Sequence, residues 1–250
     1  MYALEKYHKI SSALASILLI VIIQLFSTPE PVFRYLFPAL ILLLIGVTVY
    51  TILYLKRVDR FSYWSVIRTV LVYTAWIGLF FIIPSSVLRG VFLLVGLPVL
   101  YYVLFTTGDT GEQLLFNELV VSAFGLFMLL ASLAQYFASI GSWYVVVAFI
   151  ITVTLSRATL ELTPQSLRSK WLGSVIIGMC MAELFWALSF LPLHYSVSGF
   201  ILFVIFYALW SLYYYFLFNH LTVRKVQFHL GLSLIFIILV LLTTPWGILS

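Results

Sequence analysis

The chain has 250 residues, of which 64% are hydrophobic and 8% are charged, and its formal net charge is +5. Water-soluble domains carry about a quarter charged residues and just under half apolar ones, so this composition excludes a soluble globular domain. Apolar runs of about 20 residues recur along the chain, which indicates spanning helices rather than the alternating strands of a membrane β-barrel. We therefore expect an all-α integral membrane protein, a polytopic bundle with short loops that forms one domain over residues 1–250.

The apolar runs predict nine transmembrane helices. A basic segment precedes the first run, and no small-residue cleavage site follows it, so we expect an uncleaved first helix. The division between the third and fourth helices is the weakest, because only Pro84-Ser85-Ser86 separates them. Pro98 is expected to kink the fourth helix, since proline removes a backbone donor. In chain order, the expected spans cover about 10–26, 36–55, 65–83, 87–105, 114–135, 143–161, 171–192, 199–219 and 229–248.

The basic residues predict the orientation of these helices. Cytoplasmic loops retain an excess of Lys and Arg. With the N-terminus inside, nine of the 13 basic residues fall on the cytoplasmic side: Lys6, Lys9, Lys56, Arg57, Arg60, Arg168, Lys170, Arg224 and Lys225. Only Arg34 and Arg89 fall on the other side. This alternation predicts a cytoplasmic N-terminus and an external C-terminus, with the basic loops contacting anionic lipid headgroups.

Glu183 is a single carboxylate inside the seventh apolar run. A charged side chain at the centre of a spanning helix costs about 2.5–3.5 kcal/mol on insertion scales. We therefore expect Glu183 to face the bundle, to find a hydrogen-bond partner, or to be protonated. One interpretation is a proton- or cation-responsive site in a transport path. The alternative is a neutral acid that hydrogen-bonds to another helix, with candidate partners Thr152, Thr154, Tyr207 and Ser211.

A second group of polar residues is expected at the cytoplasmic ends of the helices. Arg157 and Glu161 are four residues apart, so they share a helix face and can pair. Glu118 is expected at a depth close to that of Arg157. Such a layer can line a vestibule for a charged headgroup or solute, or it can consist of ordinary interfacial residues that reach towards phosphates. The candidate path residues are thus Glu183, Glu118, Asn117, Arg157, Glu161 and Arg68.

Small residues repeat every four positions along the seventh run, at Ser174, Gly178 and Ala182. Such a stripe lets a neighbouring helix backbone approach closely, so we expect it to be a packing surface.

The sequence predicts no cofactor, no metal site and no catalytic group. All four histidines are expected at or beyond the ends of the spans, which argues against a haem held inside the bundle. No lysine is expected in the interior of a span. The basic loops are too short to present a nucleic-acid surface, so no nucleic-acid partner is expected.

Three functions remain open on the sequence alone. The favoured one is a carrier or permease for a small solute or a lipid, with Glu183 in its path. The second is a membrane-embedded enzyme acting on a lipid-linked substrate, and the third is a non-catalytic subunit or scaffold with a membrane-protein partner or as a homo-oligomer. Short loops and the lack of an appended domain favour the cytoplasmic (inner) membrane of a bacterium.

Overall fold

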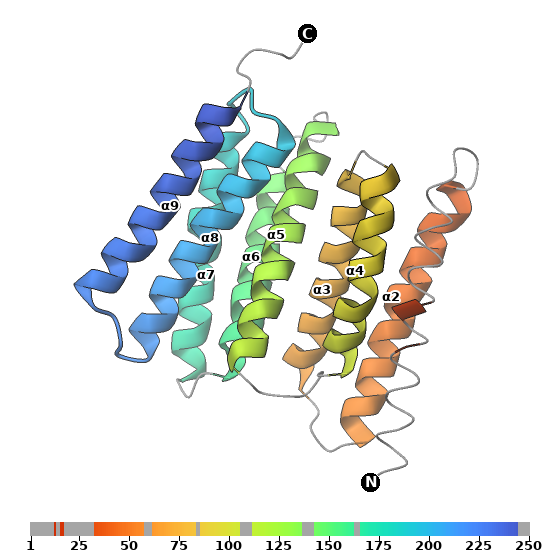
Figure 1. Ribbon diagram of the computed structural model, residues 1–250. Coiled ribbons are helices and arrows are strands. Elements are labelled where there is room, and N and C mark those ends of the chain that lie inside the picture. Colours follow the sequence, from red (N-terminus) through yellow and green to blue (C-terminus); the bar gives the residue numbers. More distant parts are fainter. Residues whose placement is uncertain are drawn as a thin grey trace. The chain divides into compact units, whose positions relative to one another are not determined.

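Figure 1 shows the computed structural model of the chain, which describes residues 33–57, 62–83, 86–105, 112–136, 143–162 and 166–244, together with Ala13, Ser16 and Ile17. Every regular element within these residues is a helix. The contacts divide the chain into two compact units, Met1–Glu118 and Leu119–Ser250. The predicted span at 10–26 lies almost entirely outside the described residues, so the count of nine helices stays a prediction, as does the single domain.

Within the described ranges, the first unit contains α2 (Phe33–Arg57), α3 (Tyr63–Ile82), α4 (Ser86–Phe105) and the beginning of α5 (Glu112–Tyr136). α3 packs against α2 and against α4. The predicted division at Pro84-Ser85-Ser86 is confirmed, because α3 and α4 are separate helices, and α4 continues through Pro98. Gly96 of α4 lies against the indole of Trp76, which stacks on Phe92 with 4.2 Å between ring centroids.

The described part of the second unit contains the rest of α5, then α6 (Trp143–Thr159), the 3-10 turn η2 (Leu160–Leu162), α7 (Leu167–Leu188), α8 (Tyr195–Leu217) and α9 (Val223–Thr243). α7 packs against α6 and α8, and α8 also packs against α9 (Figure 1). α5 joins the unit through α8, where the rings of Phe127 and Phe206 are 5.3 Å apart and Gly199 approaches the backbone of Met128.

Capping side chains set where three helices of the second unit begin. Ser166, His194 and Thr222 each accept a backbone N–H of the following turn, at 3.3, 3.4 and 3.4 Å respectively. The predicted starts at 171, 199 and 229 were therefore four to six residues too late, because a polar first turn lies outside the apolar run. The predicted ends at 192 and 248 were too late as well. α7 stops before Pro192 and α9 before Pro245, because proline and the residue preceding it disfavour helix.

The small-residue stripe of α7 is a packing surface, as predicted. Ser174, Gly178 and Ala182 are all buried. The backbone at Gly178 lies directly against the side chains of Val153 and Phe149 of α6. Glycine at this position therefore permits the close approach of α6 and α7.

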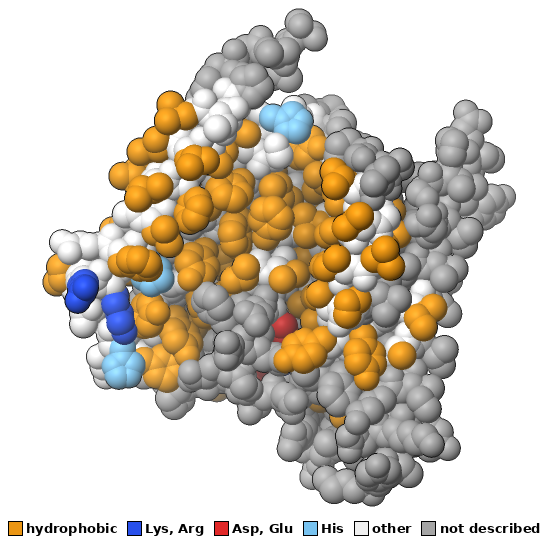
Figure 2. All heavy atoms as spheres, in the orientation of Figure 1, with side chains coloured by type: hydrophobic (Ala, Val, Ile, Leu, Met, Phe, Trp, Pro, Cys, Tyr) orange, Lys and Arg blue, Asp and Glu red, His pale blue; other side chains and the backbone are white. Residues whose placement is uncertain are grey.

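Several helices are apolar enough to cross a membrane. Five stretches of the described residues have the necessary length and composition: Tyr63–Phe80, Glu118–Gln135, Leu167–Leu188, Tyr195–Leu217 and Val223–Thr243. Figure 2 shows hydrophobic side chains covering most of the described surface of α8 and α9, with Lys and Arg gathered at one end of α9. Exposed apolar side chains gathered in this way are typical of a surface that contacts lipid or another protein.

We predict that Gly178→Ala destabilises the protein, whereas Gly231→Ala of α9 does not. A Cβ at position 178 would lie 3.2 Å from Phe149 Cδ2 and closer still to Val153, while nothing lies within 4 Å of the corresponding position at Gly231. Overpacking costs about 1–3 kcal/mol, and alanine in a free helix position gains up to about 1 kcal/mol over glycine. Thermal unfolding in detergent micelles should therefore give a lower Tm for Gly178→Ala and an unchanged or higher one for Gly231→Ala. Equal Tm values for the two variants would contradict the packing described for α6 and α7.

Candidate functional site

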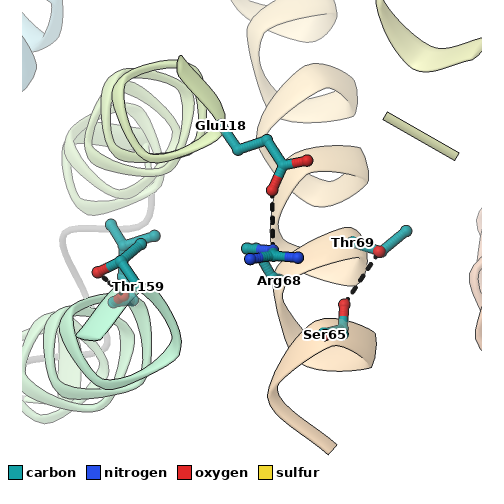
Figure 3. Close-up of polar contacts among 6 residues, drawn as sticks. Ser65, Arg68, Thr69, Glu118 and Thr159 are labelled. Atoms are coloured by element: carbon teal, nitrogen blue, oxygen red, sulfur yellow. Dashed lines mark hydrogen bonds and ion pairs between the residues drawn. The ribbon is translucent and has the colours of Figure 1, made fainter. Parts of the chain in front are cut away.

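The first unit contains a buried ion pair between two of the predicted site residues. Arg68 Nε of α3 lies 2.8 Å from Glu118 Oε2 at the start of α5, and both side chains are almost fully buried (Figure 3). That carboxylate oxygen accepts no well-directed hydrogen bond from the described residues, so the contact is chiefly electrostatic. Each charge compensates the burial of the other, because an isolated ion in an apolar interior costs several kcal/mol.

The second unit gathers all its lysines and arginines at one end, where α6 and α8 finish and α7 and α9 begin. We call this the basic end. Its cations are Arg157, Arg168, Lys170, Arg224 and Lys225. Glu161 of η2 is the acid at this end. The basic end therefore carries a clear excess of positive charge.

Two cations of the basic end are buried. Arg157 of α6 is 3% exposed, and its guanidinium carbon lies 5.6 Å from the ring centroid of Trp171. Lys170 of α7 is 6% exposed, and its ammonium donates to the backbone carbonyl of Glu161 at 2.7 Å. We call Arg157, Glu161, Lys170 and Trp171 the cationic cluster. The predicted pairing of Arg157 with Glu161 stays a prediction.

Hydroxyl and indole groups of α8 donate hydrogen bonds to residues next to this cluster. Tyr213 donates its hydroxyl proton to the backbone carbonyl of Ser169, next to Lys170, at 2.7 Å. Trp210 donates its indole N–H to the hydroxyl of Thr159, two residues after Arg157, at 2.9 Å. One face of α8 thus holds the end of α6 and the start of α7 through hydrogen bonds within an apolar interior.

A second polar group lies between α8 and α9 at the basic end. His229 is buried, and its ring centroid lies 5.5 Å from that of Tyr215 and 6.0 Å from that of Tyr207. Lys225 places its ammonium 4.3 Å from the Tyr215 ring centroid. Within the described residues, His229 Nδ1 and the hydroxyl of Ser211 have no hydrogen-bond partner. The two groups are thus available to bind water or a polar ligand.

The end of the second unit opposite the basic end contains a cavity with a volume of about 260 Å³. It lies between α5, the end of α7 and the start of α8. Gln135 is one of its polar lining residues, and its side-chain oxygen accepts the backbone N–H of Tyr195 at 2.8 Å. None of the lining residues is charged. The cavity therefore suits an uncharged or apolar group.

The structure assigns the predicted site residues to different places. Arg68 and Glu118 meet in the first unit, and Arg157 and Glu161 lie in the cationic cluster of the second. Asn117 precedes Glu118 in α5, and its side chain lies outside the described residues. A single vestibule containing all of these residues stays a prediction.

Glu183 does not face the neighbouring helices of its unit, which was one of the three alternatives expected for it. Its side chain is exposed on α7, and it makes no hydrogen bond or ion pair within the described part of the chain. Two of the partners proposed for it, Thr152 and Thr154, donate their hydroxyl protons within their own helix, to the carbonyls of Ala148 and Ile150, each at 2.7 Å. Threonine hydroxyls in apolar helices commonly bond to their own backbone in this way.

Sequence reasoning missed the roles of Lys170 and His229. Both were assigned to loops or span ends, because the spans were begun at 171 and 229. In the structure Lys170 is in the first turn of α7, and His229 lies in the second turn of α9. The capping residues Ser166 and Thr222 were the signal that would have included both residues in the helices.

We predict that Glu118→Gln and Arg68→Gln each destabilise the first unit by about 3–5 kcal/mol, because each leaves an uncompensated buried charge. The double variant Arg68→Met/Glu118→Leu should lose less unfolding free energy than either single variant, since no charge then remains buried. Unfolding free energies measured in mixed micelles check this, with Arg224→Gln, an exposed charge, as the control. Additive losses would show that the two groups do not interact.

The comparisons with known proteins place the second unit in a family. Residues 113–244 match the model of a protein family described as "Protein of unknown function (DUF5656)". The match covers α5 to α9 and so includes the cationic cluster, the α8–α9 group and the cavity. No curated protein and no solved structure matches the chain.

Proposed function

Since the chain belongs to the DUF5656 family, we propose for it a function based on its own geometry, that of an integral membrane carrier for a small anionic solute or a lipid with an anionic headgroup. The observation that carries the proposal is the burial of two cations, Arg157 and Lys170, in the cationic cluster. Buried cations within apolar helices are costly and commonly mark substrate or ion pathways.

The charge balance of the cluster favours an anionic ligand. Arg157 and Lys170 carry two positive charges, and Glu161 carries one negative charge. A phosphate or carboxylate would complete the balance, and arginine and lysine are the side chains that bind such groups best. Trp171, which is 46% exposed, covers the guanidinium of Arg157, so we propose that its indole moves when the ligand enters.

The rest of the second unit supports a path rather than a surface site. α7 and α8 line both the uncharged cavity at one end and the cationic cluster at the other. Between them lies a packed apolar layer, in which Ile177, Met181 and Phe206 are at most 4% exposed. A binding region at each end and a closed layer between them favour a carrier that opens to one side at a time. Glu183 has no role in this path, because its side chain is exposed on another face of α7.

We further propose that the basic end faces the cytoplasm and that the membrane is the inner membrane of a bacterium. All the lysines and arginines of the second unit lie at this end, as the positive-inside rule requires of a cytoplasmic side. Nine spans with the N-terminus inside and the C-terminus outside would agree with this orientation.

We predict that the double variant Arg157→Gln/Lys170→Gln loses binding of anionic lipid. In nanodiscs, phosphatidylglycerol should raise the Tm of the unaltered protein relative to phosphatidylcholine, because a ligand that binds the folded state stabilises it. The double variant should show little of this increase, whereas Arg224→Gln, a matched exposed cation, should keep it. In reconstituted vesicles, the double variant should lose the translocation of a fluorescent phosphatidylglycerol, and Arg224→Gln should keep it. A double variant with unaltered lipid response and flux would refute the proposal, and a Tm increase with inorganic phosphate alone would identify a solute rather than a lipid.

We predict opposite labelling of two exposed loop positions. In a Cys180→Ser background, Leu191→Cys should react with an impermeant maleimide added to intact cells, because it lies at the end opposite the basic end. Leu221→Cys, at the basic end, should react only after the membrane is opened. The two residues are similarly exposed, at 48% and 40%, so accessibility within the protein is matched. The reverse pattern, or labelling of both from outside, would exclude the proposed orientation.

A further inference from the structure

A seam of polar side chains runs between α8 and α9 in the second unit. On α8 it contains Tyr207, Ser211 and Tyr215, which are spaced four residues apart and so share one helix face. On α9 it contains Lys225 and His229, which are also four residues apart. We call these five residues the α8–α9 seam. It begins at the basic end, where Lys225 lies in the first turn of α9, and extends from there into the apolar part of the unit.

The ring of His229 faces Ser211 across this seam. Its centroid lies 6.0 Å from that of Tyr207 and 5.5 Å from that of Tyr215. The two tyrosines are about 12 Å apart along α8, so a ring close to both lies opposite the residue midway between them, which is Ser211. Ser211 and His229 each lie about 9 Å from the end of their helix at the basic end, and hence at the same depth.

Both polar groups are buried without a partner. Ser211 is 3% exposed and His229 is 8% exposed. Within the described residues, neither the serine hydroxyl nor Nδ1 of the histidine makes a hydrogen bond, and both atoms are shielded from solvent. Leaving such groups unsatisfied is costly, so each one in a folded protein calls for an explanation. A bulky ligand would reach these two atoms only by separating α8 from α9, whereas a proton needs no additional space.

We propose that His229 and Ser211 form a proton-binding site inside the α8–α9 seam. The neutral imidazole carries one proton, and a second proton from the water at the basic end binds its other ring nitrogen. In the resulting imidazolium both ring nitrogens are donors, so Nδ1–H donates to the hydroxyl oxygen of Ser211. The second proton returns to water when the ring becomes neutral again, and no other atom is transferred.

The groups around His229 set how strongly it binds this proton. From α8 they are the rings of Tyr207 and Tyr215, which lie at distances where an aromatic ring attracts a cation. From α9 the group is Lys225, whose ammonium lies 4.3 Å from the ring centroid of Tyr215 and opposes a second positive charge nearby. Lys225 is only half-buried, and its long side chain can withdraw towards the aqueous surface when the imidazole becomes charged.

The charge balance of the seam links proton binding to anion binding. Neither α8 nor α9 contains an acidic residue, so no carboxylate of these helices balances an imidazolium at His229. An anion that enters at the basic end would supply the balancing charge. This consequence rests on the proposed carrier function: the anion and the proton bind together, because moving both carries less net charge through the apolar layer than moving the anion alone.

The proton on His229 can be observed directly by nitrogen NMR of the full chain in nanodiscs, with isotopically labelled histidine. The variants His8→Gln, His194→Gln and His220→Gln each remove one of the four histidine signals, and the remaining signal belongs to His229. We expect this signal to change from that of a neutral ring to that of a cation between about pH 5 and pH 8. Ser211→Ala should lower the proton affinity of His229 about tenfold, because the acceptor for Nδ1–H is lost. Ser211→Thr should restore the affinity, and the exposed His220 should respond to neither substitution.

A second experiment tests the coupling to transport. In reconstituted vesicles, the translocation of a fluorescent phosphatidylglycerol should depend on pH for the unaltered chain, and His229→Gln should remove this dependence. His220→Gln, at an exposed histidine of the same end, should keep it. Translocation by none of the variants, with normal titration of His229, would contradict the carrier function and support the proton-binding site alone.

Two results would overturn the proton-binding site. One is a His229 ring that stays neutral from about pH 4 to about pH 9. The other is a titration of His229 that Ser211→Ala leaves unaltered, because the hydroxyl would then not accept from the charged ring.

Discussion

The organisation of the chain depends on the cost of placing polar groups among apolar helices. Lipid offers no hydrogen bonds, so each polar group within a span must be satisfied by the protein. Most described groups follow this rule through local contacts: Thr152 and Ser174 bond to the carbonyls four residues earlier, and Trp210 bonds to Thr159. Arg68 and Glu118 satisfy it by pairing. Within the described residues, His229 Nδ1 and the hydroxyl of Ser211 are buried without a hydrogen-bond partner, so a polar ligand or an ordered water is expected between α8 and α9.

Close helix packing creates the cationic cluster. Gly178 lets α7 approach α6, and Gly173 of α7 lies against the ring of Tyr213 of α8. The same tyrosine donates to the carbonyl of Ser169. These contacts hold the first turn of α7 against the end of α6, so that Lys170 reaches the carbonyl of Glu161. The position of Lys170 within the cationic cluster thus depends on small residues elsewhere in the helix.

α7 serves two purposes through its two faces. One face packs against α6 and α8, and it also carries Lys170 and part of the cavity lining. The other presents Glu183 outward. Because successive residues of a helix are about 100° apart, a residue on one face can change without disturbing the other.

The sequence by itself determined the all-helical class, the order of the described helices and their positions to within a few residues. It also determined that the basic residues of the second unit gather at one end. The reason is that apolar runs of spanning length alternate with loops, and the basic residues fall in or beside every second loop. It placed the starts of α7 and α9 too late, since the capping residues Ser166 and Thr222 lie outside the apolar runs. The tertiary structure alone decided which residues face inward: it buried Lys170 and His229 and exposed Glu183. In soluble helices a polar face reveals this orientation, but α7 and α9 are apolar nearly all round, because lipid and protein interior are equally apolar. Only the contacts of specific residues, such as the backbone of Gly178 against Val153, show which face of α7 packs on protein and which face does not.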